Sequence, residues 1–139
     1  MLNTEMQPPK NLWIDKMPIE LAIQTMLNNQ EEAIYALKKA MPQIKIVIET
    51  VYKKLINNNE SRLIYAGAGT SIRIAVQDAV ELYPTFGWPR DRIAFMIAGG
   101  SEAILNSVEG AEDDINQVQE ICNNLALTEN DVVIGLAAS

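Results

Sequence analysis

Hydrophobic positions in the first sixty residues recur at steps of three or four, which is the spacing of one face of an α-helix. We predict a short helix over residues 19–27, ended by Asn28-Asn29, and a long second helix that stops at Asn57-Asn58-Asn59. Pro42 lacks a backbone donor, so a kink or break is expected near Met41. Residues 1–12 contain paired prolines and no periodicity, which indicates an extended arm.

After residue 60 the pattern changes to short apolar runs without polar alternation, which is typical of strands covered on both faces. Three such runs occupy residues 63–66, 93–98 and 131–136, and amphipathic segments lie between them. The order strand–helix–strand–helix–strand with short turns predicts an α/β fold with a parallel sheet. We therefore divide the chain into two parts. Residues 1–60 form an N-terminal arm with helices, and residues 61–139 form an α/β part.

The sequence stops directly after the third predicted strand, where a parallel sheet normally continues into a helix. Three strands with bare edges are marginal as a free-standing unit. We therefore expect residues 61–139 to be the first part of a larger domain, apparently truncated.

Composition narrows the possible chemistry. The 139 residues carry a formal net charge of −7, which disfavours binding to nucleic acid. There is no His and only one Cys, so His-based triads, imidazole metal ligands and an internal disulfide are excluded. No membrane-spanning run or signal peptide is evident in the sequence, and a cytoplasmic location is expected. Any catalysis must use carboxylates, Lys, Tyr, Cys, Ser or Thr.

A glycine-rich turn follows the first predicted strand. Gly67-Ala68-Gly69-Thr70-Ser71 combines glycines, which allow close approach of a ligand, with two hydroxyls and the free N–H groups of a helix N-terminus. These groups could hold a phosphate or carboxylate. The same residues could equally form a tight strand-to-helix turn with Ser/Thr caps.

Two glutamates downstream of this turn are candidate catalytic residues. Glu81 lies at the end of the helix that follows the turn, and Glu112 lies at the start of a later helix. Paired carboxylates can share acid and base roles when their environments differ. For Glu112 the alternative is a purely structural role, because acidic residues stabilise helix N-termini.

Several ordered motifs, taken together, resemble one known family. They are Arg62-Leu63-Ile64-Tyr65-Ala66-Gly67-Ala68-Gly69-Thr70-Ser71-Ile72-Arg73, Glu81, Pro84-Thr85-Phe86-Gly87, Ile97-Ala98-Gly99-Gly100-Ser101-Glu102-Ala103, Val108-Glu109-Gly110-Ala111-Glu112-Asp113-Asp114 and Asp131-Val132-Val133-Ile134-Gly135-Leu136-Ala137-Ala138-Ser139, with Thr4-Glu5 in the arm. In their order and spacing they resemble the N-terminal portion of the N-acetylmuramic acid 6-phosphate etherases, of the sugar isomerase (SIS) domain superfamily.

The resemblance implies a five-stranded parallel sheet, of which three strands are present, and a lyase that uses no cofactor and no metal. Such an enzyme releases D-lactate from N-acetylmuramic acid 6-phosphate and leaves N-acetylglucosamine 6-phosphate, in cell-wall sugar recycling. By motif, Glu81 matches the proton donor and Glu112 the second catalytic glutamate. Binding of the phosphosugar is expected at Gly67, Gly69, Thr70, Ser71 and Ser139. Family members are typically homodimers that build the site between subunits.

One departure from the family pattern lies in the glycine-rich turn. Ile72 stands where the family's motif usually has glycine, and is expected to add bulk beside the ligand. Two other functions stay open. The chain could be a catalytically silent phosphosugar-binding or regulatory SIS module, since the related glucokinase regulatory protein uses this scaffold for binding, or a fragment that completes its sheet with a partner chain.

Overall fold

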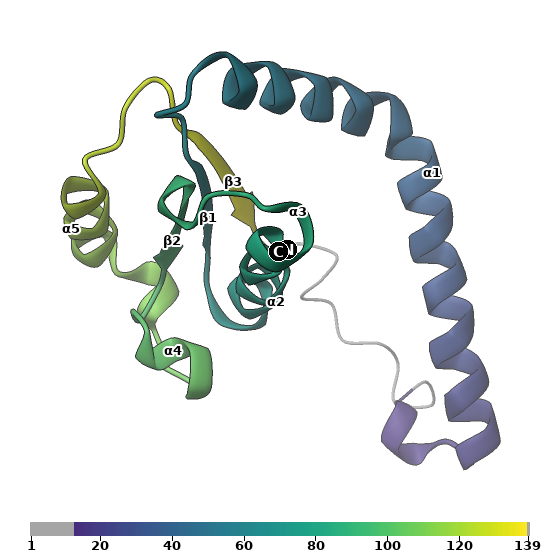
Figure 1. The fold of residues 1–139 in the computed structure, drawn as a ribbon. Coiled ribbons are helices and arrows are strands. Elements are labelled where there is room, and N and C mark those ends of the chain that lie inside the picture. The colour runs from purple at the N-terminus through teal and green to yellow at the C-terminus, as the bar shows by residue number, and fades with distance from the viewer. Residues whose placement is uncertain (1–12, 139) are drawn as a thin grey trace. The chain divides into compact units, whose positions relative to one another are not determined.

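A computed structural model describes residues 13–138 of the chain (Figure 1). The chain divides into two compact units between Thr50 and Val51. The first unit includes a short 3₁₀ helix, Ile14–Lys16, and most of helix α1 (Ile19–Asn57), and the second holds the last turns of α1 and the α/β part. The predicted extended arm, including Thr4-Glu5, and the predicted ligand residue Ser139 lie outside the described residues.

Helix α1 is continuous, so the prediction of two helices separated at Asn28-Asn29 was wrong. Asparagine is a weak helix former, but its cost is below about 1 kcal/mol per residue, and the apolar spacing runs through this point. Within the helix the Gln24 side-chain amide donates to the Asn28 side-chain oxygen at 2.8 Å. The helix is not broken at Pro42 either, because a proline removes a single backbone donor and the remaining ladder continues on both sides.

The sheet has three parallel strands in the order β2-β1-β3, which confirms the predicted α/β architecture. The strands are β1 (Leu63–Gly67), β2 (Ile93–Ile97) and β3 (Val132–Leu136). Strand β1 is central, and its first residue, Leu63, lies opposite both Ile93 and Val132. All three strands therefore end at the same edge of the sheet.

Four helices connect or follow these strands. They are α2 (Gly69–Val80), α3 (Leu82–Phe86), α4 (Glu102–Leu105) and α5 (Ile115–Leu125), with 3₁₀ turns at Arg90–Arg92 and Ala111–Asp113. The predicted helix start at Glu112 is displaced, because Asp114 is the N-cap of α5 and accepts a hydrogen bond from the Gln117 N–H at 3.0 Å. Glu112 is thereby left in the turn before the helix rather than inside it.

One face of the sheet packs against α2 and the end of α1. Leu63 and Tyr65 of β1 cluster there with Leu55 of α1 and with Ile72 and Ala75 of α2. Alternate residues of the strands share this face because side chains of a strand point to opposite sides in turn. On β1 the intervening residue Ile64 is also fully buried, so β1 is covered on both faces, as its unbroken apolar run predicts.

The edge where the strands begin is held by two arginines. The Arg62 guanidinium donates to both carboxylate oxygens of Asp131, with Nε–Oδ1 at 2.9 Å and Nη2–Oδ2 at 2.7 Å, which ties β1 to β3. This hydrogen bonding from Arg62, aided by the Thr128 N–H, holds the pKa of the buried Asp131 carboxyl well below its usual range. Arg92 donates to the carbonyls of Leu55, Asn58 and Ser61, and so caps the end of α1.

Candidate functional site

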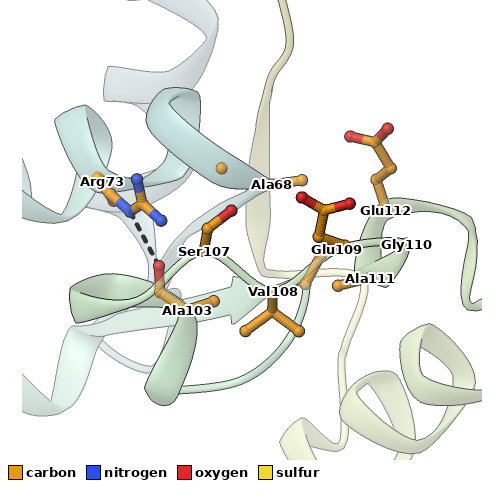
Figure 2. Close-up of a pocket in the computed structure, with 11 residues that line it drawn as sticks. Ala68, Arg73, Ala103, Ser107, Val108, Glu109, Gly110, Ala111 and Glu112 are labelled. Carbon is orange, nitrogen blue, oxygen red and sulfur yellow. Dashed lines mark hydrogen bonds between the residues drawn. The ribbon is translucent and has the colours of Figure 1, made fainter.

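A pocket of about 270 Å³ opens beside the edge where β1 and β2 end. Its walls come from the turn after β1, the turn after β2 and the loop before α5 (Figure 2). The lining residues used below are Gly69, Arg73, Ser107, Glu109 and Glu112. In parallel sheets, ligands bind outside the carboxyl ends of the strands, which is where this pocket lies.

Two glycines shape the turns around this pocket. A side chain on Gly67 would place its Cβ 2.7 Å from the Leu136 carbonyl oxygen of β3, so only glycine fits there. Gly99 has φ +81°, and a Cβ there would lie 3.0 Å from the Ala103 side chain. Gly67 thus lets β1 and β3 approach closely, and Gly99 leaves room for the side chains of Ala103 and Val108. Neither glycine itself lines the pocket.

The N-terminus of α2 faces the pocket at Ala68 and Gly69. Ala68 is the N-cap residue and offers no side-chain oxygen, so the Ser/Thr-capped turn considered from the sequence does not form. The first N–H groups of an α-helix have no partner within the helix and carry partial positive charge. This end of α2 is therefore suited to an anionic or strongly polar group of a ligand.

The loop that carries Glu112 is fastened to α2 by Arg73. The guanidinium donates from Nε to the Ala103 carbonyl at 2.9 Å and from Nη2 to the Asn106 carbonyl at 2.7 Å. From the other side, the Gly99 N–H donates to the side-chain oxygen of Gln117 at 2.7 Å. These bonds fix both ends of the segment that leads into the pocket loop.

The predicted site residues are only partly brought together. Gly69 and Glu112 line the same pocket, whereas Gly67, Thr70 and Ser71 lie beside it in β1 and in the first turn of α2. Glu81 follows the last residue of α2, so the length of this helix, about 18 Å at 1.5 Å per residue, separates it from Gly69. Within one chain, the structure does not join Glu81 to the pocket.

Ile72 does not add bulk beside the ligand site, contrary to the expectation from the sequence. Its side chain is fully buried in the core between α2 and the sheet, and it is not among the residues that line the pocket. Side chains in a helix project in different directions at steps of about 100°, and Ile72 turns inward where Gly69 and Arg73 face the pocket. The isoleucine therefore contributes apolar packing.

Two polar residues of the pocket were not singled out from the sequence. Ser107 and Glu109 stand five and three positions before Glu112 in the same loop. Figure 2 shows the Ser107 hydroxyl and the carboxylates of Glu109 and Glu112 on the same side of that loop. The sequence signal that could have identified them is their position in a polar stretch between two predicted helices. Loops at the carboxyl ends of parallel strands form the ligand sites of such sheets.

The arrangement offers hydrogen-bond donors on one side and carboxylates on the other. Helix N–H groups can bind an anionic group, and exposed carboxylates can accept hydroxyl hydrogens or move protons. Over residues 13–138, no three Cys, Asp or Glu side chains converge in the way that a metal ion requires. In the same range, no helix has both the length and the apolar character needed to cross a membrane.

Comparison with known proteins agrees with this geometry. A family model described as the glucokinase regulatory protein N-terminal SIS domain matches residues 43–139, which is more than half of the chain. The chain belongs to this SIS domain family. The match covers the last turns of α1, the whole sheet and the pocket, so the residues described above belong to the family's shared scaffold.

Curated relatives carry a more specific name. The chain is 41% identical over 138 residues to an N-acetylmuramic acid 6-phosphate etherase of Lactococcus lactis subsp. cremoris, and 40% identical over 139 residues to one of Pasteurella multocida. These alignments cover 99% of this chain and 46% and 45% of the two relatives. The resemblance seen in the motifs is thus confirmed, and the chain spans less than half the length of these relatives.

Proposed function

We propose that this SIS chain acts in the cleavage of the D-lactyl ether of N-acetylmuramic acid 6-phosphate. The observation that carries the proposal is that Gly69 and Glu112, from two separate family motifs, line one pocket at the carboxyl edge of the sheet. The product pair would be N-acetylglucosamine 6-phosphate and D-lactate. The similarity to proteins named as etherases supports the same reaction.

The reaction suits a site made of carboxylates. A base removes the proton next to the open-chain aldehyde carbon of the sugar, and an acid protonates the lactyl ether oxygen as the carbon–oxygen bond breaks. Water then adds to the unsaturated sugar, so that the sum is one water consumed and one D-lactate released. Neither step requires imidazole, and the chain has no His.

Residue roles follow from the family motifs. The N–H groups at the start of α2, with the Thr70 and Ser71 hydroxyls, bind the phosphosugar. Glu112 exchanges protons from its place in the pocket, and Glu81 is the proton donor. Because α2 separates Glu81 from the pocket of its own chain, we propose that the protein is a homodimer in which Glu81 serves the pocket of the other copy.

The test measures D-lactate released from N-acetylmuramic acid 6-phosphate by the chain and by two variants, Glu81→Gln and Glu112→Gln. Each variant is expected to lower the rate by at least about 100-fold, since each removes a proton-transfer group. Asp113→Asn is the matched control, because this exposed carboxylate neighbours Glu112 but does not line the pocket, and its rate is expected to stay within about twofold.

Mixing the two inactive variants tests where Glu81 acts. If each pocket takes Glu81 from the other copy, half of the randomly mixed dimers contain one intact site, and about a quarter of the wild-type rate returns. If both glutamates act within one chain, mixing restores nothing and the shared-site proposal fails. No lactate above background from the wild-type chain, together with binding of the phosphosugar, would contradict the lyase function.

A second candidate is a phosphosugar-binding module without catalysis. It is favoured by the family model that matches residues 43–139, whose description names a regulatory protein, and by the absence of Glu81 from the pocket. Binding of N-acetylglucosamine 6-phosphate that is unchanged in Glu112→Gln, without turnover by the wild-type chain, would identify this function.

A further inference from the structure

Arg73 is the only positively charged side chain among the described residues that line the pocket. The other charged side chains of the pocket wall are Glu109 and Glu112. Arg73 is half-buried on α2, and Figure 2 shows its guanidinium at the opposite end of the site from Glu112. Because like charges repel, an anionic group of a ligand is favoured beside Arg73 and disfavoured beside the two glutamates.

No acidic side chain neutralises the charge of Arg73. It takes part in none of the ion pairs formed within residues 13–138, and its two hydrogen bonds go to the neutral carbonyls of Ala103 and Asn106. Arg62, by contrast, donates to both carboxylate oxygens of Asp131. The two arginines thus differ in that the charge of Arg73 stays available to an anion that enters the pocket.

The guanidinium of Arg73 also keeps unused donors. It has five N–H groups, and its bonds to Ala103 and Asn106 use one on Nε and one on Nη2. Within residues 13–138, Nη1 has no hydrogen-bond acceptor. The edge formed by Nη1 and Nη2 can therefore donate two parallel hydrogen bonds, which is the arrangement that a carboxylate accepts with both oxygens.

A second positive feature lies on the same face of α2. Gly69, at the N-terminus of the helix, and Arg73 both line the pocket and are four residues apart, about 6 Å along the helix axis. In the proposed function, the N–H groups at this N-terminus bind the phosphosugar. N-acetylmuramic acid 6-phosphate carries a second anionic group, the carboxylate of its lactyl ether, which N-acetylglucosamine 6-phosphate lacks. Two positive features in one pocket match a ligand with two anionic groups.

We infer that Arg73 binds the carboxylate of the lactyl group and so selects N-acetylmuramic acid 6-phosphate over phosphosugars without this group. The choice of ligand rests on the proposed function. The bonds to Ala103 and Asn106 hold the guanidinium in place before the ligand arrives, which lowers the entropy cost of binding. Since the carboxylate belongs to the leaving group, Arg73 also orients the ether bond relative to Glu112.

The test compares two ligands that differ only in charge: N-acetylmuramic acid 6-phosphate and the analogue in which its lactyl carboxylate is a carboxamide. Isothermal titration calorimetry measures both Kd values in a Glu81→Gln background, which keeps the ligand intact. With Arg73 present, the carboxylate ligand binds about tenfold more tightly than the amide, as for one hydrogen bond to a charged group. In Arg73→Gln this preference falls to about one.

Two further variants separate the charge of Arg73 from its structural bonds. Arg73→Lys retains the positive charge without the paired donors, and keeps a preference of about threefold for the carboxylate ligand. Lys53→Gln is the matched control, because it removes a positive charge from an exposed side chain of α1 that does not line the pocket. Its preference stays at about tenfold.

Two results overturn the inference. One is a preference near one with Arg73 present, which needs no Arg73 variant to fold. The other is an Arg73→Gln variant that weakens both ligands equally and keeps the tenfold preference. Such a residue would act only on the phosphate or on the loop that it holds.

D-lactate release by the wild-type chain is measured separately, so the two proposals can fail independently. Lactate release together with a preference near one would refute the role of Arg73 and leave the lyase function intact. A tenfold preference that is lost in Arg73→Gln, without lactate release, would refute the lyase function and leave the role of Arg73 intact.

Discussion

The end of the sheet where the strands begin and the end where they finish contain different kinds of residues. Where the strands begin, buried or half-buried charges are fully paired: Arg62 with Asp131, and Arg92 with three backbone carbonyls. Where the strands end, glycines shape the turns, and Ser107, Glu109 and Glu112 are exposed around a pocket. The buried charges that hold the start of the strands and the exposed polar side chains around the pocket are thus separated by the length of a strand.

The largest expected effect on stability comes from breaking the ion pair at the edge where the strands begin. Asp131→Asn leaves Arg62 without its charged partner in a largely buried site, and lowers the free energy of unfolding by about 3 kcal/mol. Urea denaturation followed by circular dichroism measures the change.

Asp113→Asn is the control for this variant, because it removes an equally charged but exposed carboxylate, and it shifts stability by less than about 0.5 kcal/mol. If both variants lost the same free energy of unfolding, the Arg62–Asp131 pair would stabilise the fold no more than an exposed carboxylate does.

The next largest effect on stability is expected from Gly67→Ala. This variant tests whether the end of the sheet where the strands finish also contains a position with a purely structural role. The new methyl group would lie 2.7 Å from the Leu136 carbonyl oxygen, so a loss of about 2 kcal/mol in unfolding free energy is expected. Gly135→Ala, in the neighbouring strand, meets no atom within 4 Å and provides the matched control with little change. Similar losses in both variants would contradict the close approach of β1 and β3.

Acidification gives a smaller and graded effect on the same ion pair. The pKa of Asp131 is lower in the folded chain than in the unfolded one, so its stabilising contribution is complete above the unfolded value, near pH 4, and is lost as pH falls through the folded value. The stability difference between wild type and Asp131→Asn should therefore shrink as pH is lowered below about 4. Denaturation midpoints at several pH values measure this trend, and a constant difference down to pH 2 would count against it.

The smallest effect is expected in the pocket. Ser107→Ala removes an exposed hydroxyl from the pocket wall and leaves the free energy of unfolding within about 0.5 kcal/mol of wild type. Affinity for N-acetylglucosamine 6-phosphate should fall about threefold, as for loss of one neutral hydrogen bond. Isothermal titration calorimetry measures the affinity, and a destabilised variant would show that this edge also supports the fold.

How far the sequence predicted the molecule depended on the kind of signal. The strands β1, β2 and β3 were predictable because buried parallel strands have unbroken apolar runs. The continuity of α1 was not, because two asparagines and a proline are local signals for helix ends, and the apolar spacing across them outweighed these signals.

The candidate site was predictable only where its residues belonged to recognisable motifs. Gly69 and Glu112 were identified in this way, and both line the pocket. Ser107 lies outside the recognised motifs, and Glu109 lies inside one but was given no role. Both were missed because a loop brings its residues to a pocket through turns such as that at Gly99, whose effect in space is not evident from spacing. The inward direction of Ile72 depended similarly on where α2 begins.

Strand β1 pairs with both neighbouring strands residue by residue, so the register of its five residues determines how the whole sheet is aligned. Each residue of β1 has one partner in β2 and one in β3. Inserting or deleting one residue in β1 would exchange the sides to which Leu63 and Tyr65 project. It would also move Gly67 away from the Leu136 carbonyl oxygen, where a residue with a Cβ does not fit. A single-residue length change in this strand would therefore damage the core and misplace the ligand-facing turn together.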